Sequence, residues 1–482
     1  MTSLSQASLA FACLLGAVVA HEHHTDNIPE GQVISDEPID TILWLHIFIQ
    51  ITAWGVIFPT GMVLGMIRSR WHVPTQTVGS LLALAAYFLG HKHKGRQFAE
   101  NAHSKFANTL GLMLASQVII GVYLKLHLEK GINSRIRRFI VPVHGILGKA
   151  LPVVSWVQML FGGIAAMGYC RGDHLGQCLA HYIMGSAFVA YGILLTILLL
   201  VGQVWLRKTG RSQEFFDSLV IAAWGCVNTF TEHRWGQPWR GNDLQHTSMG
   251  IVWWCAGLLG MWLSRTRGGQ PKRNLVPAVV IIITGWSMSS HPQELMLSTM
   301  VHSIFGYTLM AAGAARIIEI SFLLKDKAQI SSKNVEDTNS FQYLTPFLLY
   351  ASGFLFMGAT EEQIAFLSQA GVTHVSYILL IFSAAFLMFL FVNVLLHIYA
   401  QASLPLESSN SSPSAPEGGI HLPITPRQSQ HPRNRQQNLE RVRAAEEYEL
   451  DGLMSEDEEE RPSSTDGVSE DSGSGRRKEI PR

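Results

Sequence analysis

The twenty residues at 377–396 read YILLIFSAAFLMFLFVNVLL and contain no charged side chain. A helix rises about 1.5 Å per residue, so an apolar run of this length can cross the hydrocarbon core of a bilayer. The whole chain of 482 residues shares this character, with 48% hydrophobic and 15% charged residues. Lys+Arg and Asp+Glu both number 36. This composition excludes a soluble enzyme and a nucleic-acid binder, and predicts a protein surrounded by membrane lipid.

Apolar windows separated by charged breaks predict eleven membrane-spanning helices. Each should be helical, because a backbone in lipid must satisfy its own hydrogen bonds. An all-α polytopic membrane fold is therefore the prediction. The windows lie near 41–66, 74–90, 104–124, 143–167, 181–206, 215–231, 246–264, 275–290, 299–323, 343–360 and 374–400.

The N-terminus has the pattern of a signal peptide. Residues 7–19 are apolar but too few to span, and Ala20 offers a small residue for cleavage. This predicts a signal peptide at 1–20, an outer polar leader at 21–40 and an N-terminus outside. The loops predicted to be cytosolic hold 17 Lys and Arg against seven on the outer side, in agreement with that orientation. The expected location is a membrane of the secretory pathway, either an endomembrane or the plasma membrane.

The segment 401–482 differs in composition from the membrane region. It holds 16 of the 36 acidic residues, 10 of the 36 basic residues and almost no long apolar run. Such a segment cannot bury enough surface to fold alone, so it is predicted to be a disordered acidic tail in the cytosol.

Two cysteines, Cys170 and Cys178, flank a short loop on the predicted outer side. Because that side is oxidising, a disulfide between them is expected. Two free thiols are the alternative.

Four histidines near the starts of the first four predicted helices form the main chemical pattern. Since consecutive helices alternate in direction, His46 and His103 share one membrane face, and His72 and His144 share the other. A pair of imidazoles on facing helices is what bis-histidine ligation of haem iron needs. The pattern predicts up to two b haems, one near each surface. For any single histidine, the alternative is an interfacial side chain bonded to a carbonyl group or water.

The same residues resemble the cytochrome b561 core over about 41–167, a four-helix unit placed at 41–170. The resemblance rests on His46 followed by AWG at 53–55 and by Pro59 and Gly61, on His72 with Gln76 and Gly79, on His103 with Gly111, and on His144 with Gly148. It implies that the four histidines ligate two b haems and carry electrons from cytosolic ascorbate to an outer acceptor.

The whole chain also resembles a fungal family of multi-spanning membrane proteins, the Ytp type, described as similar to mitochondrial electron-transport proteins. The residues that prompt this are GHKHKG at 90–95, NTFTEHRWG at 228–236 and WSMSSHP at 286–292. This resemblance implies a multi-spanning membrane fold, but it implies no specific biochemical activity.

Residues 171–400 are predicted to form a His-rich domain of seven helices. Topology collects several of its histidines and glutamates on the outer face, and imidazole with carboxylate suits transition metals. The residues predicted to bind a metal are His233, His246, His291 and His302. In this half, several predicted helices start with a histidine that is followed, three and four residues later, by an apolar residue and a glycine. The missing side chain of that glycine would leave room for either a flat macrocycle or a neighbouring helix.

A basic loop precedes His103 on the predicted outer side. Its cations Lys92, Lys94 and Arg96 are predicted to attract a small anionic electron donor or acceptor, such as ascorbate or a ferric chelate. Contact with anionic lipid headgroups is the alternative.

Three functions follow from these patterns. The first is transmembrane electron transfer through b haem, with reduction of a metal chelate outside; any enzymatic activity would be that of a transmembrane oxidoreductase. The second is metal binding or transport without a redox step. The third is a haem-free scaffold whose histidines only cap helices.

Overall fold

The computed structural model describes residues 28–29, 32–127, 131–233, 236, 238–239, 241–290, 293–324 and 338–403. Over these ranges the chain is helical, and its only extended pairings are two isolated bridges, Ile34–Phe98 and Arg265–Pro271. The all-α prediction is confirmed for this part of the chain. The predicted signal peptide at 1–20 lies outside the described residues, as does all but the first three residues of the predicted tail.

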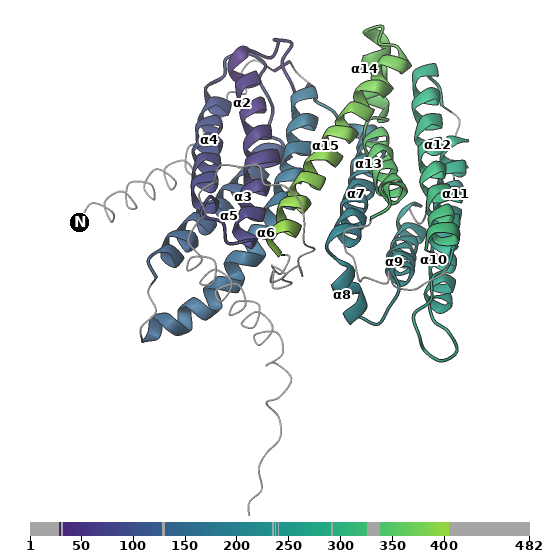
Figure 1. The fold of residues 1–482 in the computed structure, drawn as a ribbon. Coiled ribbons are helices and arrows are strands. Elements are labelled where there is room, and N and C mark those ends of the chain that lie inside the picture. The colour runs from purple at the N-terminus through teal and green to yellow at the C-terminus, as the bar shows by residue number, and fades with distance from the viewer. Residues whose placement is uncertain are drawn as a thin grey trace, which may run out of the picture. The chain divides into compact units, whose positions relative to one another are not determined.

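The N-terminal part consists of four long helical segments (Figure 1). They are the continuous run of α2 (Thr41–Thr52), η1 (Ala53–Ile57) and α3 (Phe58–Met66), followed by α4 (His72–Lys92), α5 (Ala102–Lys125) and α6 (Ile132–Met167). The helix α6 begins well before the predicted start at 143. Residues 132–138 carry three arginines, so an apolar window misses them, although a helix continues past the apolar part of its sequence.

The segment η1 is one turn of π-helix inside the first membrane helix. The N–H of Phe58 bonds the carbonyl of Ala53, five residues back, which inserts one extra residue into the helical ladder. Pro59 follows directly, and a proline cannot donate the ordinary bond to the residue four positions back. The turn therefore shifts the register of everything that follows it in α3.

The remaining helices form the C-terminal part. They are η2 (Gly172–His174), α7 (Leu175–Leu200), α8 (Gln203–Lys208), α9 (Gln213–Thr231), α10 (Gly241–Leu263), α11 (Val276–Ser289), α12 (Met296–Ile318), η3 (Glu319–Leu323), η4 (Ser340–Tyr343), α13 (Leu344–Met357), α14 (Glu361–Gln369) and α15 (His374–Ser403). The last helix, α15, packs against α3, α7 and α13 and so contacts both parts (Figure 1).

Glycines set the close packing of the C-terminal helices. A Cβ atom on Gly185 of α7 would lie 2.6 Å from the carbonyl oxygen of Gly353 on α13. On Gly306 of α12, it would lie 2.4 Å from the carbonyl oxygen of Gly285 on α11. Small residues at such crossings let helix backbones touch, as is typical of membrane proteins.

Each of the eleven predicted spans contains a helix. Seven helices in the described residues are long and apolar enough to cross a membrane, and the pair α13–α14, bent by 76°, would make an eighth. The shorter α11 has only 14 residues. The count of eleven crossings and the orientation therefore stay predictions.

Candidate cofactor site: two histidine pairs

The first histidine pair is formed by His46 on α2 and His103 on α5. Each helix start is placed by a cap: Asp40 accepts a 2.8 Å hydrogen bond from the N–H of Leu43, and Asn101 accepts one of 3.0 Å from the N–H of Ser104. The two ring centres lie 6.3 Å apart with their planes at 90°.

The second pair is formed by His72, the first residue of α4, and His144, which lies in the interior of α6. Its ring centres are also 6.3 Å apart, with an interplanar angle of 84°. The structure therefore brings together both predicted pairs, and different helices produce nearly the same geometry.

Hydrogen bonds orient three of the four rings. The Nδ1 atoms of His46, His72 and His103 lie 2.6 Å, 2.7 Å and 3.1 Å from the backbone carbonyl oxygens of Ala86, Gly61 and Gln158. A carbonyl group accepts, so these contacts assign the proton to Nδ1 and the lone pair to Nε2. Histidine ligands of metals are commonly oriented in this way. The fourth ring, that of His144, has a buried Nδ1 with no hydrogen-bond partner among the described residues.

A glycine on the neighbouring antiparallel helix faces each ring. Cβ atoms added to Gly90, Gly65, Gly162 and Gly121 would lie 2.6 Å, 2.8 Å, 3.1 Å and 3.7 Å from the nearest ring atoms of His46, His72, His103 and His144, respectively. Side chains larger than hydrogen would displace the first two rings and crowd the third.

The spacing that creates this arrangement can be read from the sequence. From His72 to Gly90, from His103 to Gly121 and from His144 to Gly162 there are 18 residues, which make about five helical turns and return to the same face. From His46 to Gly65 there are 19, because η1 inserts one residue. Within each antiparallel pair, the histidine of one helix therefore meets the glycine of the other. The sequence-based predictions did not include this repeat.

A cavity of about 460 Å³ opens at the His46–His103 pair. Both rings line it, together with Trp54, Leu110 and Leu114. Cofactor pockets typically have volumes of roughly 300–1,000 Å³ and mostly apolar walls.

The separation of the rings provides a test of fit for a metal between them. A metal–imidazole bond of about 2.0 Å, plus roughly 1.1 Å from nitrogen to ring centre, puts two opposed rings about 6.2 Å apart. The ring centres of both pairs, at 6.3 Å, are close to this separation. At both pairs, the separation of the rings and the space left by the facing glycines thus fit a haem held by two histidines. At the His46–His103 pair, the cavity fits such a haem as well.

The loop between α4 and α5 closes the cavity at this end. Its Gln97 accepts a 3.0 Å bond from the N–H of Ser35, and Phe98 pairs with Ile34. Arg96 donates to the carbonyl oxygens of Ala166, at 2.9 Å, and Glu37, at 3.2 Å. Of the three predicted docking cations, Arg96 therefore holds the loop in place, whereas the other two, Lys92 and Lys94, are exposed.

The four residues predicted to bind a metal are not gathered in the described part of the chain. His233 lies 3.2 Å from Asp243 and stacks on Trp239, and His246 lies 3.3 Å from Glu232. These contacts join the end of α9 to the start of α10. The third, His302, pairs with His181 of α7 instead. The fourth, His291, lies outside the described residues.

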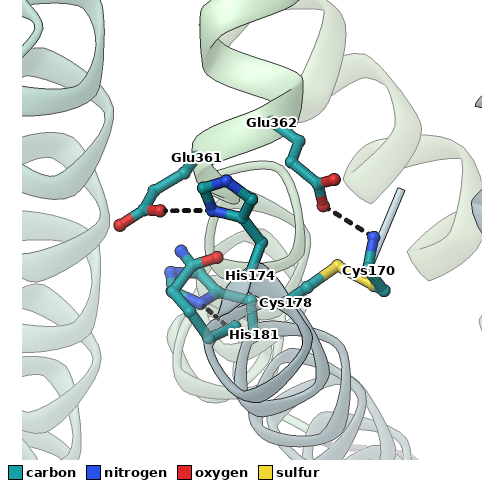
Figure 2. Close-up of a disulfide and its surroundings, with 7 residues drawn as sticks. Cys170, His174, Cys178, His181, Glu361 and Glu362 are labelled. Atoms are coloured by element: carbon teal, nitrogen blue, oxygen red, sulfur yellow. Dashed lines mark hydrogen bonds and ion pairs between the residues drawn. A yellow bond between two sulfur atoms is a disulfide. The ribbon is translucent and has the colours of Figure 1, made fainter. Parts of the chain in front are cut away.

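Cys170 and Cys178 are joined by a disulfide (Figure 2). The backbone N–H of Cys170 donates a 2.6 Å hydrogen bond to Glu362, and His174 lies 3.0 Å from Glu361. Both glutamates belong to α14, so the loop between α6 and α7 is fastened to that helix.

A buried ionic cluster was missed by sequence reasoning. Glu214 of α9 accepts 2.7 Å bonds from Arg273 and Arg316, and Arg316 also pairs with Glu319 at 2.7 Å. All four side chains are buried. The available signal was the pair of opposite charges three residues apart inside the predicted span 299–323, since charges at membrane depth need partners.

The chain is similar to known fungal membrane proteins. The family described as "Protein YTP1-like, C-terminal" matches residues 154–400, and "Domain of unknown function (DUF2427)" matches 26–127. Protein YTP1 of Saccharomyces cerevisiae is 47% identical over 258 residues, which cover 53% of this chain and 54% of that protein. An uncharacterized membrane protein of Schizosaccharomyces pombe, C3B8.06, is 24% identical over 449 residues, covering 68% of this chain and 87% of that protein. The matched region thus spans about half the length of YTP1. No solved structure matches the chain.

Proposed function

We propose, for a chain that belongs to the YTP1-like family of membrane proteins, a function in transmembrane electron transfer through two b haems. The observation that carries the proposal is the pair of equal imidazole separations, 6.3 Å for His46–His103 and 6.3 Å for His72–His144. The resemblance of these helices to the cytochrome b561 core supports the same assignment.

Haem held by two imidazoles exchanges single electrons and leaves no coordination position open for a substrate. The chain's own residues would hold it. The carbonyl groups of Ala86, Gly61 and Gln158 orient three of the rings. Glycines on the opposed helices leave space beside all four, and the loop of Gln97 and Phe98 covers the cavity at the His46–His103 end.

The two pairs lie at different depths of the four-helix unit. The ring of His144 faces Gly121, which is 18 residues beyond His103 on α5. At about 1.5 Å per residue this corresponds to roughly 27 Å along the helix, close to the thickness of a bilayer core. Trp54 and Phe58 are buried at intermediate positions of the first helix, with ring centres 4.5 Å apart. This placement suits electron movement from one membrane face to the other.

The proposed electron donor or acceptor at the His46–His103 end is a small anion such as ascorbate or a ferric chelate. Exposed Lys92 ends α4 and exposed Lys94 lies in the following loop, which lines this cavity, and cations attract anionic molecules. Replacing both lysines with Gln should slow the reaction of this haem with an anionic reagent and leave its reaction with a neutral one unchanged. Equal rates for both reagents in wild type and variant would remove the loop as docking site.

Haem content tests the function directly. The detergent-purified full chain should show a Soret band and about two haems per chain in a pyridine haemochrome assay. His103→Ala and His144→Ala should each lose about half of the haem. The matched control is His397→Ala, because His397 is exposed near the end of α15 and its Nε2 lies 3.0 Å from the side-chain amide of Gln401.

A folded wild type without a Soret band would overturn the proposal in favour of a metal-binding protein or a haem-free scaffold. Equal haem content in all four proteins would overturn the assignment of the ligands.

A further inference from the structure

A third imidazole pair lies in the C-terminal part. His181 on α7 and His302 on α12 have ring centres 5.9 Å apart and planes at 82°. This geometry is close to that of the two N-terminal pairs. Both side chains are buried, with exposed fractions of 8% and 4%.

Hydrogen bonds orient these two rings in the same sense. The Nδ1 atom of His181 lies 2.8 Å from the carbonyl oxygen of Gln177, and that of His302 lies 2.9 Å from the carbonyl oxygen of Ser298. Because a carbonyl group only accepts, each contact assigns the proton to Nδ1 and the lone pair to Nε2. The same tautomer is found in histidines that bind metals through Nε2.

The packing around this pair leaves no space for a haem. The ring of Phe356 stacks on His181 at 4.5 Å with an interplanar angle of 11°, and Phe305 lies 4.8 Å from Phe356. One turn along each helix, Gly185 and Gly306 contact the backbones of α13 and α11. A group placed between the two imidazoles must therefore be of atomic size.

The nearby cysteines do not compete as ligands. Cys178 precedes His181 by three residues on α7, but its sulfur is bonded to that of Cys170 (Figure 2). Within the described ranges, the one closely spaced group of three His, Cys, Asp or Glu ligand atoms is Cys170, Cys178 and Glu362. Neither His181 nor His302 belongs to such a group.

We propose that His181 and His302 bind a single Cu(I) ion. Two neutral imidazoles bring no negative charge, and burying a monovalent ion in an apolar site costs less than burying a divalent one. Imidazole is a good ligand for copper, whereas structural Zn(II) takes four ligands. The separation of 5.9 Å is slightly below the roughly 6.2 Å of a linear arrangement, which corresponds to a bent N–Cu–N unit.

This site is independent of haem loading, so its test is separate. The purified full chain is titrated with Cu(I) under anaerobic conditions against a chromogenic Cu(I) chelator. Wild type should retain one more copper ion per chain than His181→Ala or His302→Ala, with affinity at least tenfold higher. His397→Ala is the matched control and should behave as wild type, and haem content should be equal in all four.

Two further measurements keep the proposal testable if an alanine variant fails to fold. X-ray absorption at the copper edge of wild type should show two or three nitrogen neighbours. The variant His302→Met should retain Cu(I) and add a sulfur neighbour. Equal copper retention in all variants, a sulfur-only shell in wild type, or binding of Zn(II) in preference to Cu(I) would each overturn the proposal.

Discussion

The N-terminal four-helix unit and the C-terminal part use the same two residue types, histidine and glycine, in opposite ways. In the N-terminal unit, Gly90 and Gly65 face the rings of His46 and His72. In the C-terminal part, Gly185 and Gly306 follow His181 and His302 by four residues, yet they face the backbones of neighbouring helices. The neighbouring helix therefore decides whether a glycine provides room for a ring or a close helix crossing.

Burial also differs between the two parts. In the most apolar window of Met296–Leu323, 56% of the residues are buried, against 11–22% in the four N-terminal spans; the windows of α7 and α15 have 28% and 17%. In the C-terminal part, Phe356 stacks on the ring of His181 with ring centres 4.5 Å apart, whereas the N-terminal helices surround a cavity of about 460 Å³. Substitutions in the C-terminal part should therefore affect stability, and those in the N-terminal unit should affect cofactor content.

The largest effect is expected from the buried ionic cluster of the C-terminal part. Glu214→Gln leaves Arg273 and Arg316 without their shared carboxylate, which should lower the free energy of unfolding by about 3–5 kcal/mol. Denaturant titration in detergent micelles measures this. The exposed pair of Glu361 and His174 is the control, and Glu361→Gln should change stability by less than about 1 kcal/mol. Equal losses in both variants would contradict the comparison.

A smaller loss is expected from Gly306→Ala. The added Cβ would lie 2.4 Å from the carbonyl oxygen of Gly285, so α11 and α12 must separate, at a cost of about 1–3 kcal/mol. A Cβ atom added to Gly111 of α5 would meet no atom of another described helix within 4 Å, so Gly111→Ala should be neutral or slightly stabilising. The unfolding midpoint of Gly306→Ala should therefore lie below that of wild type, and that of Gly111→Ala should equal or slightly exceed it. Identical curves would show that the helix crossing is not tight.

In the N-terminal unit, glycine substitutions should change haem content rather than stability. In Gly90→Ala the new Cβ would lie 2.6 Å from Nδ1 of His46, so the ring must move and about half of the haem should be lost. In Gly121→Ala the distance to His144 is 3.7 Å, an ordinary contact, and haem content should stay at the wild-type level. The haemochrome assay measures both. A full complement of haem in Gly90→Ala would show that the glycine does not serve the site.

The smallest effect concerns the loop that covers the cavity. The backbone N–H of Lys94 lowers the pKa of Asp40 below the ordinary carboxyl value, so the ionised form is favoured in the folded protein. Its contribution to stability is present above the unfolded pKa of about 3.9 and is lost as pH falls through the lower folded pKa.

Wild type should therefore melt slightly above Asp40→Asn at pH 7, with a difference below about 1 kcal/mol that shrinks as pH falls below about 4 and is lost below the folded pKa. Asparagine can keep the helix cap to Leu43, but its NH2 group cannot accept the hydrogen bond from the N–H of Lys94, so the charge is reported by the pH-dependent part of the difference. A difference that does not change with pH would exclude the carboxylate as the cause.

The sequence alone determined where the membrane helices lie, because each helix satisfies its own backbone hydrogen bonds and needs only a long apolar run. It also predicted which N-terminal histidines lie at the same end of the four-helix unit, since alternation of helix direction follows from chain order. The boundary of α6 was missed where the helix continues through Arg135, Arg137 and Arg138.

Lateral neighbours were decided only by the tertiary structure. The sequence predicts which end of its helix a residue occupies, but not which helices lie beside it. It therefore could not show that His302 lies against His181, or that His233 and His246 lie beside carboxylates. Nor could it bring Glu214, Arg273 and Arg316 together from three separate segments. Such contacts depend on how helices pack side by side, and that packing arises from the shapes and charges of residues far apart in the chain.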